Sequence, residues 1–255
     1  MNYLLAILAG AVQGLTEFLP VSSTGHLIIF ENIFGISQKD FGLAFDASLH
    51  LGTLMAILLF FYKDYLQIFK DKLYLKLAVG TIPAALGGAI FEKSIESSFR
   101  GLHVVGTTLV IFSIVMILAE KISKQNKNAS SLNLRQSTLV GLFQALALIP
   151  GISRSGSTIS AGLFLGLTRG QSARFAFMLS GPIVAGAGAK KFLEVATGGN
   201  VGSHDFGFFV IGIISSSIFG YLTIKYFLKY LSSKNLYPFI VYRVLLGLIL
   251  IVTNK

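Results

Sequence analysis

The sequence contains no cysteine and few charged residues. Without cysteine there is no disulfide framework, no thiolate nucleophile and no cysteine-ligated metal. Charged residues make up 13% of the 255 residues, about half the share in an ordinary soluble domain. Hydrophobic residues make up 53%, and mean hydropathy is +0.74. This balance argues against a soluble enzyme and indicates an integral membrane protein.

The N-terminus also lacks the features of a cleavable signal peptide. No basic region precedes the first apolar stretch, and Glu17 and Pro20 interrupt that stretch before any small-residue cleavage site. We therefore expect the first segment to remain in the mature protein.

Six apolar stretches each have close to the roughly 20 residues that a helix needs to cross a bilayer. They cover about residues 44–62, 74–91, 103–119, 173–195, 207–225 and 238–254. Two further regions, 3–36 and 137–170, each hold an apolar run, a break of Pro, Ser and Gly, and a second, shorter apolar run. We predict that each folds as a re-entrant helical hairpin, because broken backbone is tolerated at membrane depth where protein surrounds it.

The two hairpin regions resemble each other at an offset of 131 residues. The run at 10–15, which contains Gln13, recurs at 141–146, which contains Gln144. Three more positions match at this offset: Ser22 with Ser153, Thr24 with Ser155, and Gly25 with Gly156. Each hairpin is followed by three spans, and because three is odd, the second copy would enter from the opposite face of the membrane.

We therefore predict an all-α polytopic membrane protein with an inverted-topology repeat, each half being a re-entrant helical hairpin plus three transmembrane helices. The chain would form a single membrane domain over 1–255. Its halves, about 1–122 and 137–255, would be joined by a polar cytoplasmic linker at 123–136.

Lysine and arginine are distributed unevenly among the loops. If 63–76, 120–136 and 225–237 share one side, that side carries eleven of them and the opposite side six. The positive-inside rule then makes the first side cytoplasmic and places both termini and the first hairpin on the outer side. Because these lysines lie between apolar segments, contact with anionic membrane lipids explains the net charge of +10, and we expect no nucleic-acid partner.

The first hairpin carries a polar run that is costly to bury at membrane depth and therefore indicates a site. Gln13 and Glu17 are four residues apart on one helix face, so their oxygens could hold a divalent cation, Mg²⁺ or Ca²⁺. The alternative is that the pair only forms hydrogen bonds with each other or with a neighbouring helix. After Pro20 a new helix can begin, with free N–H groups that suit an anion.

Hydroxyls and a histidine follow that proline. Ser23 and His26 are three residues apart, so the imidazole could assist a hydroxyl nucleophile or protonate a leaving group, although a purely structural histidine is the alternative. Ser22 and Thr24 suit either phosphate binding or helix capping. His50 faces either the site or another helix.

The second polar run, at 150–158, carries a cation. Arg154 lies between Ser153 and Ser155, so a planar guanidinium with hydroxyls on either side could grip phosphate. The alternative is an arginine that extends towards the membrane surface. Arg169 and Arg174 lie closer to a helix boundary and fit the membrane interface better. Together the two runs predict a two-part site for a phosphorylated lipid.

Both runs resemble motifs of a known family, the undecaprenyl-diphosphate phosphatases, or bacitracin-resistance family. Residues 13–26 are similar to its (E/Q)xxxE-PxSSxGH pattern, and residues 150–158 to its PGxSRSxxT pattern. The resemblance covers essentially the whole chain. Gln13 stands where many members have glutamate; the pattern allows both, but a neutral amide is a weaker metal ligand.

This resemblance implies hydrolysis of undecaprenyl diphosphate to undecaprenyl phosphate and phosphate. The reaction would recycle the lipid carrier of peptidoglycan and other cell-wall polymers in a bacterial inner membrane, with bacitracin resistance as a result. Glu17 would hold the metal or activate the nucleophile, Ser23 would attack and His26 would act as acid and base, unless His26 itself attacks. Ser153, Arg154 and Thr158 would grip the phosphate, and the site would open to the outer face.

Two other classes of function fit the same features. A secondary transporter or flippase for a phosphorylated lipid or an anion would share the repeat and the broken helices. A structural membrane protein would need the polar residues only for stability. Whether two copies form a homodimer is left open.

Overall fold

The structure is a computed structural model that describes residues 3–36, 43–69, 72–197 and 206–254. These residues are almost entirely helical and contain no β-strand, only one isolated bridge between Lys127 and Leu167. The helices of the first half are α1 (Tyr3–Phe18), α2 (Ser23–Phe34), α3 (Leu43–Phe60), α4 (Tyr62–Leu66), α5 (Leu73–Ser98) and α6 (Leu102–Ile122). The 3-10 turn η2 (Ala129–Ser131) is followed by α7 (Leu134–Leu146), α8 (Arg154–Phe164), α9 (Arg169–Thr197), α10 (Phe206–Leu231) and α11 (Tyr237–Thr253).

Both predicted breaks are present, and they share the same local geometry. The helix α1 ends at Phe18 and α2 begins after Ser22; α7 ends at Leu146 and α8 begins after Ser153. Ser22 and Ser153 both have positive φ angles, 74° and 78°, which are uncommon for residues other than glycine. Each serine hydroxyl accepts a hydrogen bond from the backbone N–H three residues later. The two serines therefore start their helices in the same way.

A helix covers each of the six predicted spans, with different ends. The first span stops at Phe60, and a short helix, α4, follows it. The helices α5 and α10 run beyond the predicted ends, to Ser98 and Leu231. The linker is shorter than the predicted 123–136, because Asn133 caps α7 and forms a reciprocal capping box with Gln136.

Among the described residues, three helical segments are long and apolar enough to cross a membrane: Leu73–Phe91, Leu102–Ile122 and Phe206–Leu231. Shorter apolar helices cover Tyr3–Phe18, Phe45–Phe60 and Tyr237–Thr253. The helix α9 is less apolar, and it packs against α3, α5, α8 and α10. By length and composition these helices are those of a multi-pass membrane protein. Many large apolar side chains on the outer helices are exposed, as expected where lipid surrounds them.

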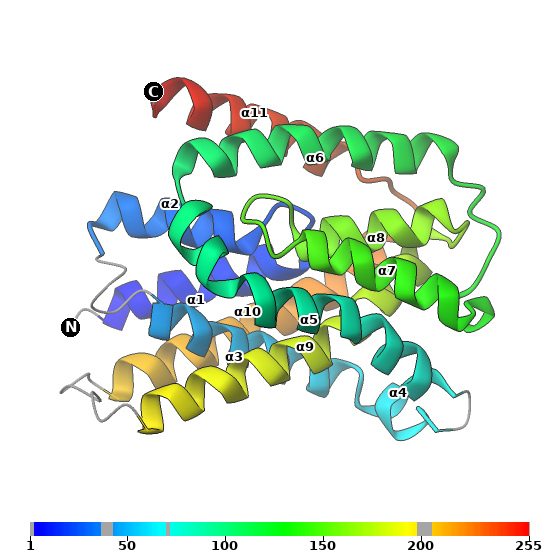
Figure 1. Cartoon of the computed structure of the whole chain (residues 1–255), viewed down its shortest axis with the longest axis horizontal. Helices are drawn as coiled ribbons and strands as arrows, with labels where there is room; N and C mark the ends of the chain where they lie inside the picture. The colour runs from blue at the N-terminus through cyan, green and yellow to red at the C-terminus, as the bar shows by residue number, and fades with distance from the viewer. Residues whose placement is uncertain (1–2, 37–42, 70–71, 198–205, 255) are drawn as a thin grey trace.

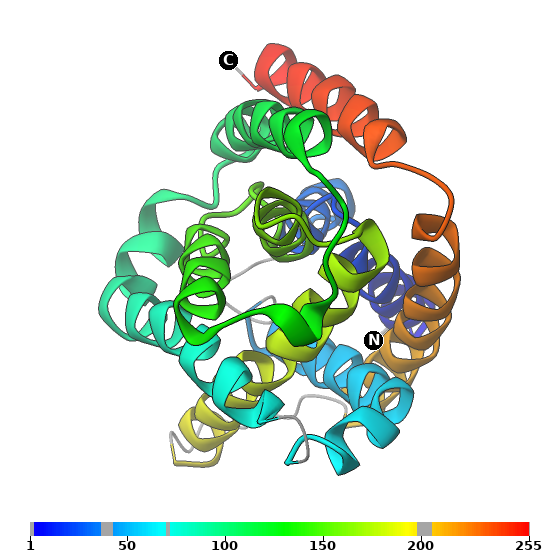
Figure 2. The same cartoon turned by 90° about the vertical axis from the view of Figure 1, so that its right-hand side faces the viewer.

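The short helices of the hairpins lie inside the bundle. Figure 2, which looks along the helices, shows α2 and α8 near the centre, with α5, α6, α10 and α11 around them. Residues Ser155–Leu163 of α8 are all buried. The long helices thus surround the broken backbone.

Glycines allow the first helix of each hairpin to approach a long helix closely. The helix α1 packs along α10 and α7 packs along α5 (Figure 1). A Cβ atom added at Gly14 would lie 2.6 Å from the carbonyl oxygen of Ser216 in α10. A Cβ at Gly141 would overlap the backbone of Gly80 in α5. These contacts fix where the hairpins enter the bundle.

We predict that Gly14→Ala lowers the free energy of unfolding by about 1–3 kcal/mol, because the added methyl group meets the α10 backbone, which cannot move aside easily. Thermal unfolding in detergent measures this. The matched control is Gly170→Ala in α9, where a Cβ meets nothing within 4 Å. That control should be neutral or slightly stabilising, since alanine favours helix. Equal melting temperatures for the two variants would contradict the close packing.

Candidate functional site

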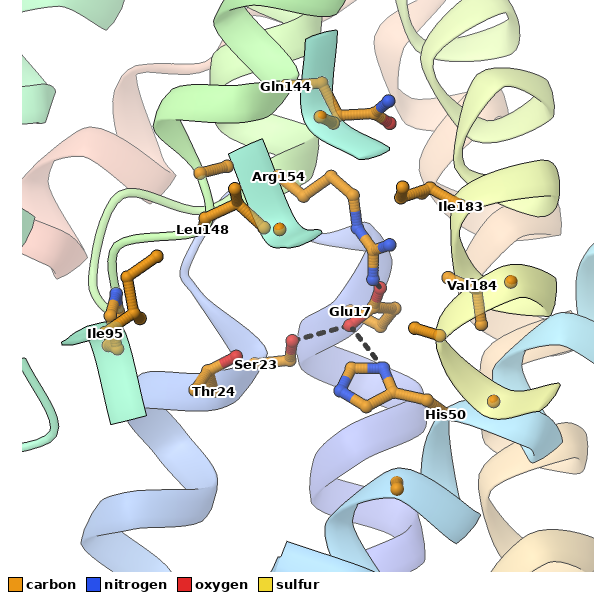
Figure 3. A pocket seen from close by; sticks show the side chains of 18 of the residues that line it. Glu17, Ser23, Thr24, His50, Ile95, Gln144, Leu148, Arg154, Ile183 and Val184 are labelled. Atoms are coloured by element: carbon orange, nitrogen blue, oxygen red, sulfur yellow. Dashed lines mark hydrogen bonds and ion pairs between the residues drawn. The ribbon is translucent and has the colours of Figure 1, made fainter. Parts of the chain in front are cut away.

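A cavity of about 620 Å³ lies where the two hairpins meet α3, α5 and α9 (Figure 3). Its apolar lining comes mainly from α5, α9 and the loop before α8, and includes Ala84, Ala85, Ala89, Leu148, Ile149 and Ile183. Its polar lining contains six of the residues predicted from the motifs: Glu17, Ser22, Ser23, Thr24, Ser153 and Arg154. The two motifs, separated by more than a hundred residues, therefore share one cavity.

Glu17 is the centre of the polar cluster. Its carboxylate is buried and forms an ion pair with Arg154, which comes from the second hairpin (Figure 3). Its Oε2 atom accepts hydrogen bonds from Ser23 Oγ at 2.5 Å and from Gln13 Nε2 at 3.1 Å. Every donor that its charge needs is thus supplied by the protein.

The chain places Ser23 and Arg154 at equivalent points, each being the first residue of a helix. Ser23 begins α2 and Arg154 begins α8, each directly after a capping serine with positive φ. Helix N-termini carry free N–H groups and a partial positive charge, which favour an anion. The cavity therefore receives a hydroxyl, a guanidinium and two helix N-termini.

Direct hydrogen bonds join the two breaks. The backbone N–H of Gly151 donates to Ser22 Oγ at 3.1 Å, and Ser155 Oγ donates to the Leu19 carbonyl oxygen at 2.9 Å. Ser22 and Ser155 are therefore used in holding the hairpins together. Thr24 differs from them, because it lines the cavity and its hydroxyl has no hydrogen bond to any described residue. Its hydroxyl can therefore serve a ligand.

Four predicted site residues lie outside the cavity lining: Gln13, His26, Ser155 and Thr158. The Thr158 hydroxyl is buried and donates to the Arg154 carbonyl oxygen at 2.7 Å within α8. The His26 imidazole lies 2.8 Å from the Ser22 carbonyl oxygen through Nδ1, and 2.6 Å from Tyr242 Oη through Nε2. These contacts turn its ring towards α11, so Ser23 hydrogen-bonds to Glu17 and the expected Ser23–His26 pair is absent. The catalytic role of His26 stays a prediction.

Two basic residues take positions that the motifs did not reveal. His50 of α3 lines the cavity, with Nδ1 2.9 Å from Gln13 Nε2. Arg100 lines another part of the cavity, where its Nη2 lies 3.0 Å from Asp46 Oδ2 and 3.6 Å from Glu31 Oε2. The available signals were His50 and Asp46, two polar residues in an otherwise apolar span. Their spacing in the sequence could not show which residues they face.

Arg243 of α11, like Arg100, was not among the candidate site residues, although an arginine inside an apolar span is a signal in itself. It is fully buried. Its guanidinium donates to the carbonyl oxygens of Pro20 at 3.2 Å and Gly151 at 3.0 Å, and further to Leu109 and Ser113. Pro20 and Gly151 belong to the two breaks. Arg243 does not line the cavity. It supplies the hydrogen bonds that the backbone acceptors of both hairpins need.

The residues predicted for the membrane interface pair with acids. Arg169 makes a bidentate contact with Glu120, whose Oε1 also accepts from the Leu236 backbone N–H at 2.8 Å. Arg174 pairs with Asp64. The first pair joins α6 to α9 and to the start of α11, and the second joins α9 to α4. Neither lines the cavity, so both are structural.

The predicted metal ligands do not form a ready site for a divalent cation. Both Glu17 oxygens already accept from donors, and one of those donors is the Arg154 guanidinium. Gln13 directs its amide nitrogen towards Glu17, and its Oε1 has no partner among the described residues. No group of three or more His, Cys, Asp or Glu side chains suitable for a metal occurs in the described part of the chain. Gln13 and Glu17 as arranged do not fit a cation.

Comparison with known proteins identifies the family. The family model described as "Bacitracin resistance protein BacA" matches residues 6–249. The chain belongs to this family. The expected family resemblance is thus confirmed.

Curated relatives in the BacA family are similar over nearly their full length. A protein named undecaprenyl-diphosphatase from Thermodesulfovibrio yellowstonii is 44% identical over 247 residues, which cover 96% of this chain and 95% of the relative. Proteins of the same name from Elusimicrobium minutum and Marinobacter nauticus are each 40% identical, over 258 and 261 residues. Those alignments cover 97% of this chain in both cases, and 96% and 97% of the relatives.

We predict that Arg243→Met lowers the free energy of unfolding by about 3 kcal/mol, because several buried acceptors lose their donor at once. Thermal unfolding in detergent measures the change. Arg135→Met, at an exposed position of α7, is the control and should stay within about 0.5 kcal/mol of the wild type. A neutral Arg243→Met would show that the two breaks hold without this arginine.

Proposed function

We propose that this chain hydrolyses undecaprenyl diphosphate to undecaprenyl phosphate and inorganic phosphate, which agrees with the name undecaprenyl-diphosphatase of its relatives. The product is the lipid carrier of cell-wall polymers, so the reaction recycles that carrier and accounts for bacitracin resistance. The observation that carries the proposal is the cluster of Glu17, Ser23 and Arg154, which unites both motifs in one cavity.

Ser23 is the nucleophile in this proposal. Its hydroxyl already donates to Glu17, so the carboxylate can take the proton as Ser23 Oγ attacks the terminal phosphorus. The O–P bond to Ser23 forms, and the bridging P–O bond breaks. Undecaprenyl phosphate leaves as an anion, and because phosphate is a good leaving group near neutral pH, a strong proton donor is not needed. Water then attacks the phosphorus of the phosphoserine, and the P–O bond to Ser23 breaks. Glu17 returns its proton to Ser23 Oγ, and the phosphate leaves with both protons of the water, as dihydrogen phosphate.

Arg154 and the helix N-termini supply the positive charge. The Arg154 guanidinium is paired with Glu17 in this structure, and it can turn from the carboxylate to the phosphoryl oxygens when a diphosphate enters. The N-termini of α2 and α8 face the same anion. Charge stabilisation of this kind is the main requirement of phosphoryl transfer. Thr24 and Ser153 belong to the same polar part of the cavity lining.

A divalent cation, Mg²⁺ or Ca²⁺, remains part of the proposal without a preformed set of protein ligands. The diphosphate itself offers the oxygens that such a cation prefers. The apolar residues of α5 and α9 suit the first units of the prenyl chain, while the chain end extends towards membrane lipids.

We further propose the inverted-topology repeat with halves of about 1–122 and 137–255. The packing supports it, because α1 lies on α10 as α7 lies on α5, and α3 contacts α10 as α9 contacts α5. In the proposed repeat α1, α3 and α5 correspond to α7, α9 and α10. Replacing each helix by its counterpart therefore converts each contact of a pair into the other. The matching positive φ angles of Ser22 and Ser153 support it further.

We also propose that the chain lies in the bacterial inner membrane with its site opening to the outer, periplasmic face; the charges of the loops support this orientation. In Figure 1 the connections from α3 to α5, α6 to α7 and α10 to α11 lie at the right-hand end of the bundle. The start of α1, the end of α11 and the connection from α5 to α6 lie at the left-hand end. The right-hand loops carry the larger number of lysines and arginines, which favours that end as cytoplasmic.

No observation on the described residues favours a transporter or flippase, whereas a nucleophile next to a carboxylate favours chemistry. A transporter predicts that purified protein binds the lipid diphosphate without releasing phosphate. A homodimer remains a prediction as well, and light scattering of the protein–detergent complex determines the number of chains.

We predict that purified protein releases phosphate from undecaprenyl diphosphate in detergent. Ser23→Ala should lower kcat at least about 10³-fold, because the nucleophile is lost. Arg154→Ala should lower kcat/KM about 10²–10³-fold, because a charge donor is lost. Ser97→Ala, at an exposed position of α5, should keep wild-type activity. Wild-type rates in Ser23→Ala would refute this nucleophile, and binding without phosphate release by the wild type would favour transport.

We also predict that a chelator such as EDTA slows phosphate release at least about tenfold, and that excess Mg²⁺ or Ca²⁺ restores it, because a cation neutralises diphosphate oxygens. The melting temperature should not change on chelation, since the described residues contain no preformed ligand set. Full activity in chelator would remove the cation from the proposal.

A further inference from the structure

His50 occupies a place next to the reacting groups that the mechanism above does not use. Its side chain lines the cavity and is 27% exposed, whereas that of Glu17 is 4% exposed. The His50 Nδ1 atom lies 2.9 Å from Gln13 Nε2 and 3.7 Å from Glu17 Oε2. Three side chains, from α1 and α3, therefore form one connected group.

The hydrogen bonds in this group determine where the His50 proton lies. The Glu17 carboxylate only accepts, so the Gln13 amide must present its NH₂ group to it, at 3.1 Å. The same nitrogen contacts His50 Nδ1, which must then accept the second amide proton. An imidazole that accepts at Nδ1 is neutral and carries its proton on Nε2. A rotated amide would place Gln13 Oε1 against the carboxylate, which is repulsive.

The Nε2–H group that results is directed at the cavity. Figure 3 shows the second ring nitrogen of His50 turned away from Glu17, towards the open space beside Ser23 and Thr24. No described residue forms a hydrogen bond with His50 Nε2. The contacts of the His50 ring with Gln13 and Glu17 both involve Nδ1. The imidazole therefore offers one N–H donor beside the predicted nucleophile.

We propose that His50 binds the phosphoryl group of the substrate through Nε2–H, and that Gln13 is the positioning residue that keeps the proton there. The inference rests on the proposed function and extends it to two further residues. A neutral donor aimed at the phosphoryl oxygens stabilises the negative charge that they carry in the transition state. His50 is thus a donor in addition to Arg154, and it comes from outside both motifs.

This assignment also explains a neutral amide at position 13. A carboxylate there would accept from the imidazole, draw the proton to Nδ1 and leave Nε2 without one. It would also add a second negative charge beside Glu17, at membrane depth. Gln13 avoids both effects, so it acts through His50 and Glu17 and not as a metal ligand.

Phosphate release from undecaprenyl diphosphate tests the donor. His50→Leu should lower kcat/KM roughly 100-fold, because it removes the N–H group. His50→Gln should stay within about fivefold of the wild type, because its amide also donates. His103→Leu, at an exposed position of α6, should have no effect. Wild-type activity in His50→Leu, or equal losses in His50→Leu and His50→Gln, would overturn the role of the donor.

Nitrogen NMR of ¹⁵N-histidine-labelled protein tests the position of the proton without an activity assay. The chain has four histidines, so the His50 signals are identified by their loss in His50→Gln. We expect an unprotonated Nδ1 and a protonated Nε2 in the wild type, and a proton shifted towards Nδ1 in Gln13→Glu. A wild-type proton on Nδ1, or no change in Gln13→Glu, would overturn the role of Gln13.

These two measurements separate the failure of the inference from that of the proposed function. A wild type that releases no phosphate refutes the proposed function, and with it the role of His50 in that reaction. An active wild type with an equally active His50→Leu refutes the inference alone. Melting temperatures of the variants show whether a loss of activity comes from unfolding, and His50→Gln keeps the test valid if His50→Leu does not fold.

Discussion

The part-buried ion pair between Glu17 and Arg154 is the interaction on which the rest of the structure depends. Either charge alone would be very costly inside an apolar bundle, and each therefore needs the other. The residues are 137 positions apart in the chain, so their pairing requires two separate hairpins to meet tip to tip. Ser23, Thr24 and Ser153 reach the cavity because they belong to these tips.

The backbone carbonyls at the two breaks need hydrogen-bond donors, and two residues that do not line the cavity supply them. Arg243 donates to the carbonyl oxygens of Pro20 and Gly151, while the Thr108 hydroxyl donates to that of Pro150 at 2.6 Å. In lipid these carbonyls would have no partner. The breaks thus lie between two arginines: Arg154 faces the substrate, and Arg243 holds the chain that presents it.

The sequence predicted an all-helical membrane protein with two helix breaks, and it predicted that the polar residues at those breaks belong to one site. Proline and glycine between apolar runs predicted both breaks, and apolar length predicted the helices. The partner of Ser23 was different from the expected one, because its hydroxyl bonds to Glu17 while the His26 ring turns to Tyr242. Helical spacing places Ser23 and His26 near one another, but it cannot show which neighbouring helix attracts each side chain.

The sequence by itself determined the membrane class, the two helix breaks and the types of chemical group, since apolar length, proline positions and residue identity are local properties. Only the tertiary structure decided which groups meet. His50 and Arg243 take part because α3 and α11 pack beside the hairpins, and such packing depends on surfaces that close glycine contacts bring together. Neighbours in space that are far apart in sequence leave no local pattern, and here they complete the site.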